Sequence, residues 1–223
     1  MTTDLPLEQR VLALLRECEV VEDQHPHPRF SNATECLRMH VYDARAVQSF
    51  TWSPESRRPV RWNAAAVSGT ALGEWMEKAA RRLGAETQAH VHLDGDPEVE
   101  GAADIVWPDA VWDLKWVSEY AWKQAKRGPK DRHCVQAEGY AAALGKPKWA
   151  VIYLPHHMLG KGEKLEFLAY EGETDPRTAE VIRGRWLAVR QHADAGTLPD
   201  REHSQTDFEC RVCRHRTQCW EST

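Results

Sequence analysis

The spacing of hydrophobic residues changes along the chain, and each change predicts a change of secondary structure. Between residues 64 and 83 apolar side chains recur with helical periodicity, and Gly84 follows as a natural C-cap. Residues 86–93, 99–107 and 110–117 instead alternate or form short apolar runs. Turn-forming sequences at 94–97 and 108–110 separate these three segments. We therefore expect a helix followed by a three-stranded meander.

The remaining segments extend this alternation of helices and strands. Further helices are expected over residues 5–18, 31–46, 118–125, 131–144 and 176–193, with Ser31 as the N-cap of the second. Buried strands are expected over 149–154 and 165–170, and a polar, proline-interrupted loop over 50–62. A polar loop is expected to lead into the cysteine-rich tail. This order of elements predicts an α/β or α+β sandwich.

Length and charge narrow the class of protein. The 223 residues suit one domain, since domains typically hold ~100–200 residues. An acidic N-terminal segment and the lack of a long apolar run predict no secretory signal and no membrane contact, so we expect a cytoplasmic protein. The net charge of −5 weighs against non-specific nucleic-acid binding, yet basic residues cluster at 57–61, 123–132 and 211–216. A solvated helix face is the alternative interpretation of each basic cluster.

Asp104, Asp113 and Lys115 form the main chemical pattern within the expected strands. Asp113 and Lys115 are two residues apart, so their side chains face the same side of a strand. The tight hairpin at 107–110 brings Asp104 alongside them. Two carboxylates offer hard oxygen ligands to Mg²⁺ or Mn²⁺, and a lysine beside them can position a water molecule. Surface strands also alternate charges, but the apolar flanking residues make unpaired ionisable groups costly here. The pattern therefore predicts metal-assisted phosphodiester hydrolysis.

Three cysteines near the C-terminus have the spacing C-x2-C-x5-C, which suits ligands of one metal centre: Cys210, Cys213 and Cys219. Zinc and iron–sulfur clusters are held by four such ligands, so a fourth is expected elsewhere. The candidates are Cys18, Cys36 and Cys134. Disulfides are the alternative, which the absence of a signal peptide disfavours. Spacing alone leaves zinc and a 4Fe-4S cluster equally open.

Several motifs, in one order, resemble the PD-(D/E)XK nucleases. The segments 101–104 (G-x-x-D) and 113–115 (D-x-K) are similar to the motif that names the superfamily. Gln136 and Tyr140, as Q-x-x-x-Y on one helix face, are similar to the motif of RecB-type members. Cys36 together with the C-terminal cysteines resembles RecB-like nucleases that hold a 4Fe-4S cluster. These include the fourth CRISPR-associated (Cas) protein family, the nuclease domain of AddB and phage-encoded exonucleases.

The resemblance, which covers about residues 31 to 220, implies an α/β fold with a restriction-endonuclease-like core. A central mixed sheet would be flanked by helices, and the N- and C-terminal segments would be joined by a metal cluster. We expect a single nuclease domain over 1–223, a catalytic core at 64–171, and cluster-binding segments at 31–46 and 208–220. The implied ligands of the 4Fe-4S cluster are Cys36, Cys210, Cys213 and Cys219. The cluster would be structural.

The same resemblance implies roles for the residues of the nuclease motifs. Asp104, Asp113 and the Leu114 carbonyl would bind Mg²⁺ or Mn²⁺, and Lys115 would position the attacking water. Gln136 and Tyr140 would orient DNA or the lysine. One position departs from the family, because Gly73 occupies the place of a metal-binding histidine. Glu74 or Glu77 are the candidate replacements, and Glu77 lies one helical turn from Gly73 on the same face. The alternative is that both glutamates are only solvated.

The leading hypothesis is a metal-dependent DNA exonuclease that acts on single-stranded or tailed DNA ends. Its context would be recombination, repair, or phage or CRISPR DNA processing in the cytoplasm of a bacterial or phage-infected cell, with recombination or CRISPR proteins as partners. Backbone phosphates would be contacted by Lys123, Lys126, Arg127, Lys130 and Arg132. The alternative, motivated by Gly73, is a non-catalytic iron–sulfur or zinc protein of the same fold that binds DNA or serves as an adaptor.

Overall fold

The computed structural model describes residues 28–48, 64–95, 97–156 and 166–221. Its strands form one sheet in the order β1 (Glu86–Leu93), β2 (Val99–Val106), β3 (Ala110–Val117), β4 (Lys148–Pro155) and β5 (Leu168–Glu173). The first three strands are an antiparallel meander, β3 and β4 are parallel, and β5 is antiparallel to β4. The sheet is therefore mixed.

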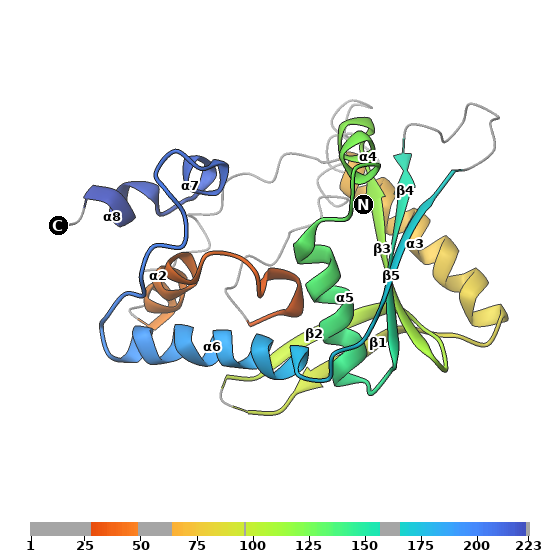
Figure 1. Cartoon of the computed structure of the whole chain (residues 1–223), viewed down its shortest axis with the longest axis horizontal. Helices are drawn as coiled ribbons and strands as arrows, with labels where there is room; N and C mark the ends of the chain where they lie inside the picture. The colour runs from red at the N-terminus through yellow and green to blue at the C-terminus, as the bar shows by residue number, and fades with distance from the viewer. Residues whose placement is uncertain (1–27, 49–63, 96, 157–165, 222–223) are drawn as a thin grey trace, which may run out of the picture.

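Helices cover both faces of the sheet (Figure 1). The helix α3 (Ala64–Arg82) packs against β1, β2 and β3. The crossover between the parallel strands contains α4 (Glu119–Ala125) and α5 (Asp131–Ala143). Along β4, Val151 and Tyr153 pack with residues of α4 and α5, whereas Ile152 and Leu154 pack in the cluster that contains Ala80 of α3. Both faces of β4 are thus buried, as is usual for a parallel strand between helices.

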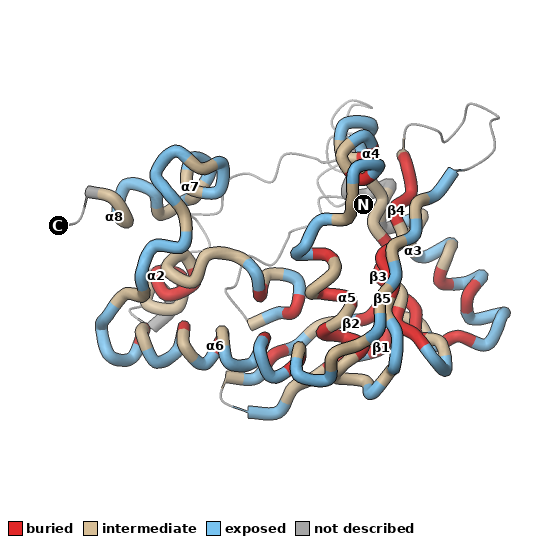
Figure 2. The backbone as a smooth tube through the Cα atoms, viewed as in Figure 1, coloured by how far each residue is buried: buried red, intermediate tan, exposed pale blue. Residues whose placement is uncertain are grey.

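The first and last described segments form a second group of helices beside the sheet. α6 (Thr178–Asp194) packs against α5 and against α2 (Leu37–Gln48), while the short 3₁₀-helix η1 (Phe30–Asn32) contacts α5. The helices α7 (Phe208–Val212) and α8 (Arg216–Glu221) lie above α2 in the view of Figure 1, apart from the sheet. Figure 2 shows buried residues concentrated in the sheet, α5 and the facing sides of α2 and α6, with none along α7 and α8.

The expected α/β class with a restriction-endonuclease-like core is confirmed, and several boundaries agree. Strands were expected at 86–93 and 110–117 and have those bounds. The helix that starts at Ala64 ends before Gly84, whose φ of 90° supplies the left-handed C-cap. Ser118 is the N-cap of α4, and its hydroxyl accepts the Ala121 N–H. Among the described helices, none is long and apolar enough to cross a membrane.

Three expectations about boundaries were wrong. The helix expected from Ser31 begins at Leu37, because Arg185 of α6 donates hydrogen bonds to the carbonyls of Ala33 (2.7 Å) and Glu35 (3.0 Å). Those carbonyls are therefore engaged by a side chain that is remote in sequence. The last strand begins at Leu168, and the helix expected from Pro176 begins at Thr178. The segments at 5–18 and 50–62 lie outside the described residues.

Candidate active site

A cavity of about 790 Å³ lies where α3 meets the central strands. Its lining includes Glu77 of α3, Gln88 of β1, Asp104 of β2 and Lys115 of β3. Arg132, at the start of α5, lines it from the side of the crossover. The cavity therefore brings together Asp104, Lys115 and Arg132, which were all expected at the site. It also contains Glu77, the candidate replacement for the histidine whose place Gly73 takes.

Asp104 is turned toward β3 by an irregularity in the sheet. Ala103 and Val106 pack in the same hydrophobic cluster although they are three residues apart, so the strict alternation of β2 is broken between them. At this point the Asp104 carboxylate accepts the Leu114 backbone N–H at 2.7 Å. Burial raises the pKa of Asp104, while the Leu114 N–H and the charge of Lys115 act in the opposite direction.

Asp113 and Lys115 form a close ion pair on the face of β3 that meets α5. The Lys115 ammonium lies 3.0 Å from Oδ1 and 2.9 Å from Oδ2 of Asp113. Only Oδ1 has hydrogen-bond geometry, so the buried Oδ2 has no hydrogen-bond donor in the described structure. Asp113 is 2% exposed. Burial raises its pKa to about 7, Lys115 opposes this, and the charge of Asp104 adds to it.

Gln136 and Tyr140 continue this network on α5. Lys115 donates a hydrogen bond to Gln136 Oε1 at 3.1 Å, and Gln136 Nε2 donates to the Tyr140 hydroxyl at 3.2 Å. Both α5 residues are buried. Burial raises the pKa of Tyr140 to about 12, so its hydroxyl stays protonated at neutral pH. The Q-x-x-x-Y spacing thus places a neutral amide against the lysine and a neutral hydroxyl behind the amide.

Gln88 connects two carboxylates of the cavity and was not identified from the sequence. Its amide donates to Glu77 Oε1 at 2.7 Å and to Asp104 Oδ1 at 3.4 Å. The neighbouring strand pairs, 87 with 105 and 89 with 103, set Gln88 and Asp104 at the same level of the β1–β2 hairpin. That register could have identified Gln88. Glu77 is buried, whereas Glu74 lines the cavity from an exposed position.

The basic residues of the crossover fall into two groups. Lys130 and Arg132 line the cavity. Lys123, Lys126 and Arg127 lie on or just after α4 and are exposed; Lys123 pairs with Glu119 at 2.8 Å. His133 also lines the cavity and is buried, with Nδ1 2.8 Å from the Tyr153 hydroxyl. It is therefore a satisfied polar group.

The cavity's donor set fits a hard divalent cation. Glu77 and Asp104 line the cavity, Asp113 lies behind them beside Lys115, and Asp113 Oδ2 is a buried carboxylate oxygen with no hydrogen-bond donor. The Lys115 ammonium, 2.9 Å from this oxygen, supplies a positive charge that offsets its burial. Carboxylate oxygens are the ligands that Mg²⁺ and Mn²⁺ prefer. Glu77, Asp104 and Asp113 are therefore candidate ligands of one cation, although they are not among the described groups whose ligand atoms all lie within 4.8 Å of one another.

The cysteines form a second centre beside α2. Cys36 directly precedes α2, where the backbone N–H groups of Arg38 and Met39 donate hydrogen bonds to its sulfur. Cys213 accepts the His215 N–H at 3.4 Å. Burial raises the pKa of both thiols, and the charge of Cys213 acts on Cys36. The charges of Cys210 and Cys219 act on Cys213. All the described cysteines are free of disulfides. Cys18 lies outside the described residues.

Cys134 lies apart from this cysteine group. It is on α5, and the charges that raise its pKa after burial are those of Asp131, Glu138 and Asp113. Its surroundings are thus those of the cavity region. Of the two alternatives that the structure describes, Cys36 and Cys134, Cys36 is the one near the C-terminal cysteines.

Asp43 fixes the C-terminal cysteine segment to α2, an interaction that the sequence did not predict. Its buried carboxylate accepts hydrogen bonds from Arg214 Nε at 2.9 Å and lies 2.7 Å from His215 Nε2. Arg214 Nη2 also donates to the second carboxylate oxygen. Burial pushes the pKa of Asp43 upward, but the hydrogen bonds from His215 and Arg214 outweigh it and hold the pKa low. Arg214, a member of the basic cluster at 211–216, is thus paired with Asp43.

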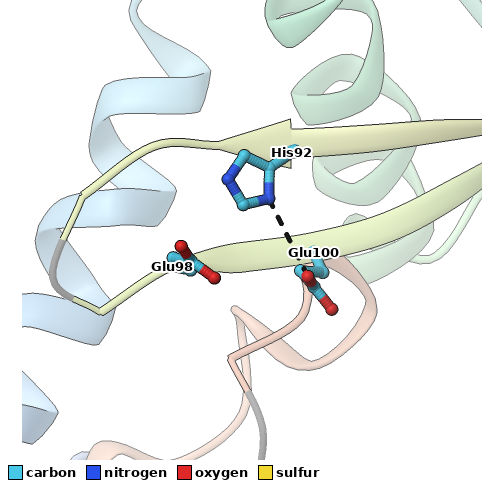
Figure 3. A group of neighbouring side chains, drawn as sticks. All are labelled: His92, Glu98 and Glu100. Carbon is cyan, nitrogen blue, oxygen red and sulfur yellow. Dashed lines mark ion pairs between the residues drawn. The ribbon is translucent and has the colours of Figure 1, made fainter.

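A third group of ligating side chains lies in the β1–β2 hairpin (Figure 3). The ligand atoms of His92, Glu98 and Glu100 all lie within 4.8 Å of one another. His92 Nδ1 is 3.9 Å from Glu100, and its Nε2 is 3.1 Å from Asp94. Both glutamates are exposed. Ion pairing on a surface hairpin accounts for this group.

No family model and no curated protein sequence matches the chain. Crystal structures that share its fold include the following three. SSO0001 is 16% identical, covers 98% of each chain and has a TM-score of 0.55. The alkaline exonuclease LHK-Exo from Laribacter hongkongensis is 13% identical, over 78% of this chain and 90% of that one, with a TM-score of 0.55. A phage-related exonuclease from Haemophilus somnus 129PT is 14% identical, over 77% and 95%, with a TM-score of 0.52. At these identities the likeness shows the fold, which two exonucleases share.

Proposed function

We propose that this chain is a metal-dependent DNA exonuclease. The observation that carries the proposal is that Asp104 and Lys115 line the cavity beside α3, while Asp113 pairs with Lys115 behind them. Two solved structures of the same fold are exonucleases, and one of these, LHK-Exo, has also been solved in complex with dAMP. Chemistry and fold therefore favour the same class of reaction.

In the proposed site Glu77, Asp104, Asp113 and the Leu114 carbonyl would hold Mg²⁺ or Mn²⁺. Such a cation supplies Lewis-acid stabilisation of charge on a phosphate and lowers the pKa of water. Lys115 is held between the Asp113 carboxylate and the Gln136 amide oxygen. It can therefore donate a hydrogen bond to the attacking water or to a phosphate oxygen. Gln136, fixed by Tyr140, positions Lys115.

The substrate proposal rests on the basic side of the cavity. Lys130 and Arg132 are on its wall, within reach of a phosphate that enters toward Lys115. Lys123, Lys126 and Arg127 would contact DNA outside the cavity. We propose single-stranded or tailed DNA ends as substrate, and a role in recombination, repair, or phage or CRISPR DNA processing together with partner proteins of those pathways.

The cysteine centre is proposed to hold a 4Fe-4S cluster on Cys36, Cys210, Cys213 and Cys219. The charge of Cys213 acts on Cys36, and the charges of Cys210 and Cys219 act on Cys213, which supports one shared centre for the four sulfurs. Backbone N–H donors to Cys36 and Cys213 also suit thiolates that ligate a cluster.

The test is digestion of end-labelled single-stranded and tailed DNA with Mn²⁺ or Mg²⁺. We expect wild-type protein to shorten DNA from its ends, and Lys115→Ala and Asp113→Ala each to lose activity by at least about a hundredfold, as for removal of one group that stabilises a transition state. Lys148→Ala is the matched control, since Lys148 is exposed at the start of β4 and does not line the cavity. It should retain activity.

Two outcomes would contradict the proposal. Digestion by Lys115→Ala at the wild-type rate, with contaminating nucleases excluded, would refute the active site. A folded wild-type protein that binds DNA ends without cutting them under either metal would instead support a non-catalytic DNA-binding or adaptor protein.

A further inference from the structure

We propose that Gln88 is a metal ligand of this site, through an amide that turns over when the cation binds. The inference rests on the proposed metal site of Glu77, Asp104 and Asp113, and extends it by a residue on a different strand. Gln88 lines the same cavity as Glu77 and Asp104.

The Gln88 amide lies where a cation shared by two carboxylates would lie. A single nitrogen, Nε2, is 2.7 Å from Glu77 Oε1 and 3.4 Å from Asp104 Oδ1. These two oxygens belong to different elements, α3 and β2, and the Gln88 nitrogen is the donor they share. The partly positive N–H groups of Gln88 thus lie between the two carboxylates, where a cation would otherwise offset their charge.

The direction of the amide follows from the acceptors around it. Carboxylates without a proton can only accept, so the NH₂ end of Gln88 must face them in the metal-free protein. A cation has the opposite requirement, since it attracts an oxygen. A half-turn about the last side-chain bond exchanges Oε1 and Nε2 of a planar amide, and side-chain amide oxygens are suitable ligands for hard cations. The same side chain can therefore serve both states.

The backbone at Gln88 supports a role beyond strand pairing. Its φ of 50° is the single positive value among the described non-glycine residues. Such a conformation costs of order 1–3 kcal/mol and persists where the surrounding structure enforces it. In this place it coincides with the two hydrogen bonds that the side chain makes to Glu77 and Asp104.

The experiment measures Mn²⁺ affinity by titration, with free Mn²⁺ followed by electron paramagnetic resonance. Gln88→Ala should weaken binding about tenfold, the lower end of the effect usual for groups around a metal. Gln88→Glu should bind Mn²⁺ more tightly than wild type, yet melt at a lower temperature without metal, because a third carboxylate then meets Glu77 and Asp104 with no donor. The exposed hairpin acids could bind Mn²⁺ weakly, so all variants carry Glu98→Gln.

Thr87→Val is the matched control. Thr87 neighbours Gln88 and accepts a hydrogen bond from Arg81 of α3 at 2.6 Å, so it makes a comparable α3–β1 tie outside the cavity lining. It should leave Mn²⁺ affinity unchanged. If Gln88 only ties α3 to β1, both Gln88 variants would lower the melting temperature and neither would change Mn²⁺ affinity, which would overturn the inference. Tighter binding by Gln88→Ala would also overturn it.

Asp104→Asn separates this inference from the proposed function. If Asp104→Asn binds Mn²⁺ as wild type does, the proposed metal site itself is wrong. If Asp104→Asn loses binding while Gln88→Ala and Gln88→Glu match wild type, only the role of Gln88 is wrong. Should Gln88→Ala not fold, the opposed effects expected of Gln88→Glu still decide the question.

Discussion

Replacement of Gly101 by alanine tests how the core positions Lys115. A Cβ at this position would lie 2.7 Å from both Cε1 and the hydroxyl oxygen of Tyr140, closer than real Cβ contacts. Tyr140 is 4% exposed, and its ring centroid lies 4.8 Å from that of Phe30, so the ring has little room to withdraw. Overpacking of this kind costs about 1–3 kcal/mol. We expect Gly101→Ala to lower the free energy of unfolding by that amount.

Displacement of the Tyr140 ring should also disturb the hydrogen bonds that join Tyr140, Gln136 and Lys115. Tyr140 holds Gln136, and Gln136 accepts from Lys115, so a moved ring changes the position of the lysine. Urea unfolding gives the change in stability, and digestion of end-labelled DNA gives the change in rate. Gly184→Ala is the control, because no atom lies within 4 Å of its added Cβ in the exposed part of α6. It should stabilise the protein by up to ~1 kcal/mol, as Gly→Ala does in a helix.

A double-mutant cycle identifies the contact that is responsible. In a Tyr140→Ala background the clash is gone, so Gly101→Ala should cost less than ~0.5 kcal/mol. An equal cost of Gly101→Ala with and without the Tyr140 ring would refute the reasoning, because the destabilisation would then arise in the strand itself.

Two further predictions concern pH and the cysteine centre. Burial, followed by the charges of Lys115, Arg132 and Lys130, lowers the pKa of His133 from 6.5 to about 3. The unfolded chain therefore binds a proton below pH 6.5 that the folded protein does not, and stability is lost as the pH falls from 6.5 toward 3. His133→Asn should reduce this loss by up to about 1 kcal/mol per pH unit in urea unfolding at pH 6.5 and 5.5; parallel curves would contradict it. Cys36→Ala should lose iron, measured by metal analysis and absorption, whereas Cys134→Ala should retain it; the reverse would refute the ligand set.

Much of the sheet and the central pair of the site could be predicted from the sequence because their causes are local. The alternation of polar and apolar residues over 86–93 and the apolar run at 110–117 predicted two strands from residue spacing alone. Asp113 and Lys115 share a strand face, and their atoms lie 3.0 Å apart as this spacing requires. Gln136 and Tyr140, one helical turn apart, are joined by a hydrogen bond for the same reason.

The features that the sequence did not reveal depend on contacts between distant segments. The helix α2 starts late because Arg185 takes the carbonyls of Ala33 and Glu35, which are more than a hundred residues away in the chain. Arg214 and His215 meet Asp43 across a similar separation. In the sequence, Gln88 is one polar residue of an alternating strand. Its place beside Asp104 becomes clear only from the pairing of β1 with β2.

The cysteine group beside α2 and the carboxylate–lysine site on the central strands lie in different parts of the fold. Among the described elements, α6 contacts both α2, which follows Cys36, and α5, which carries Gln136 and Tyr140. Asp43, Arg214 and His215 hold the cysteine segment on α2 without contacting Lys115 or Asp113. Loss of a ligand at Cys36 should therefore act first on the stability of the α2–α7–α8 region, because the hydrogen bonds that fix Lys115 are made within β3 and α5. The proposed cluster would therefore contribute to folding, whereas the proposed reaction would depend on the central strands.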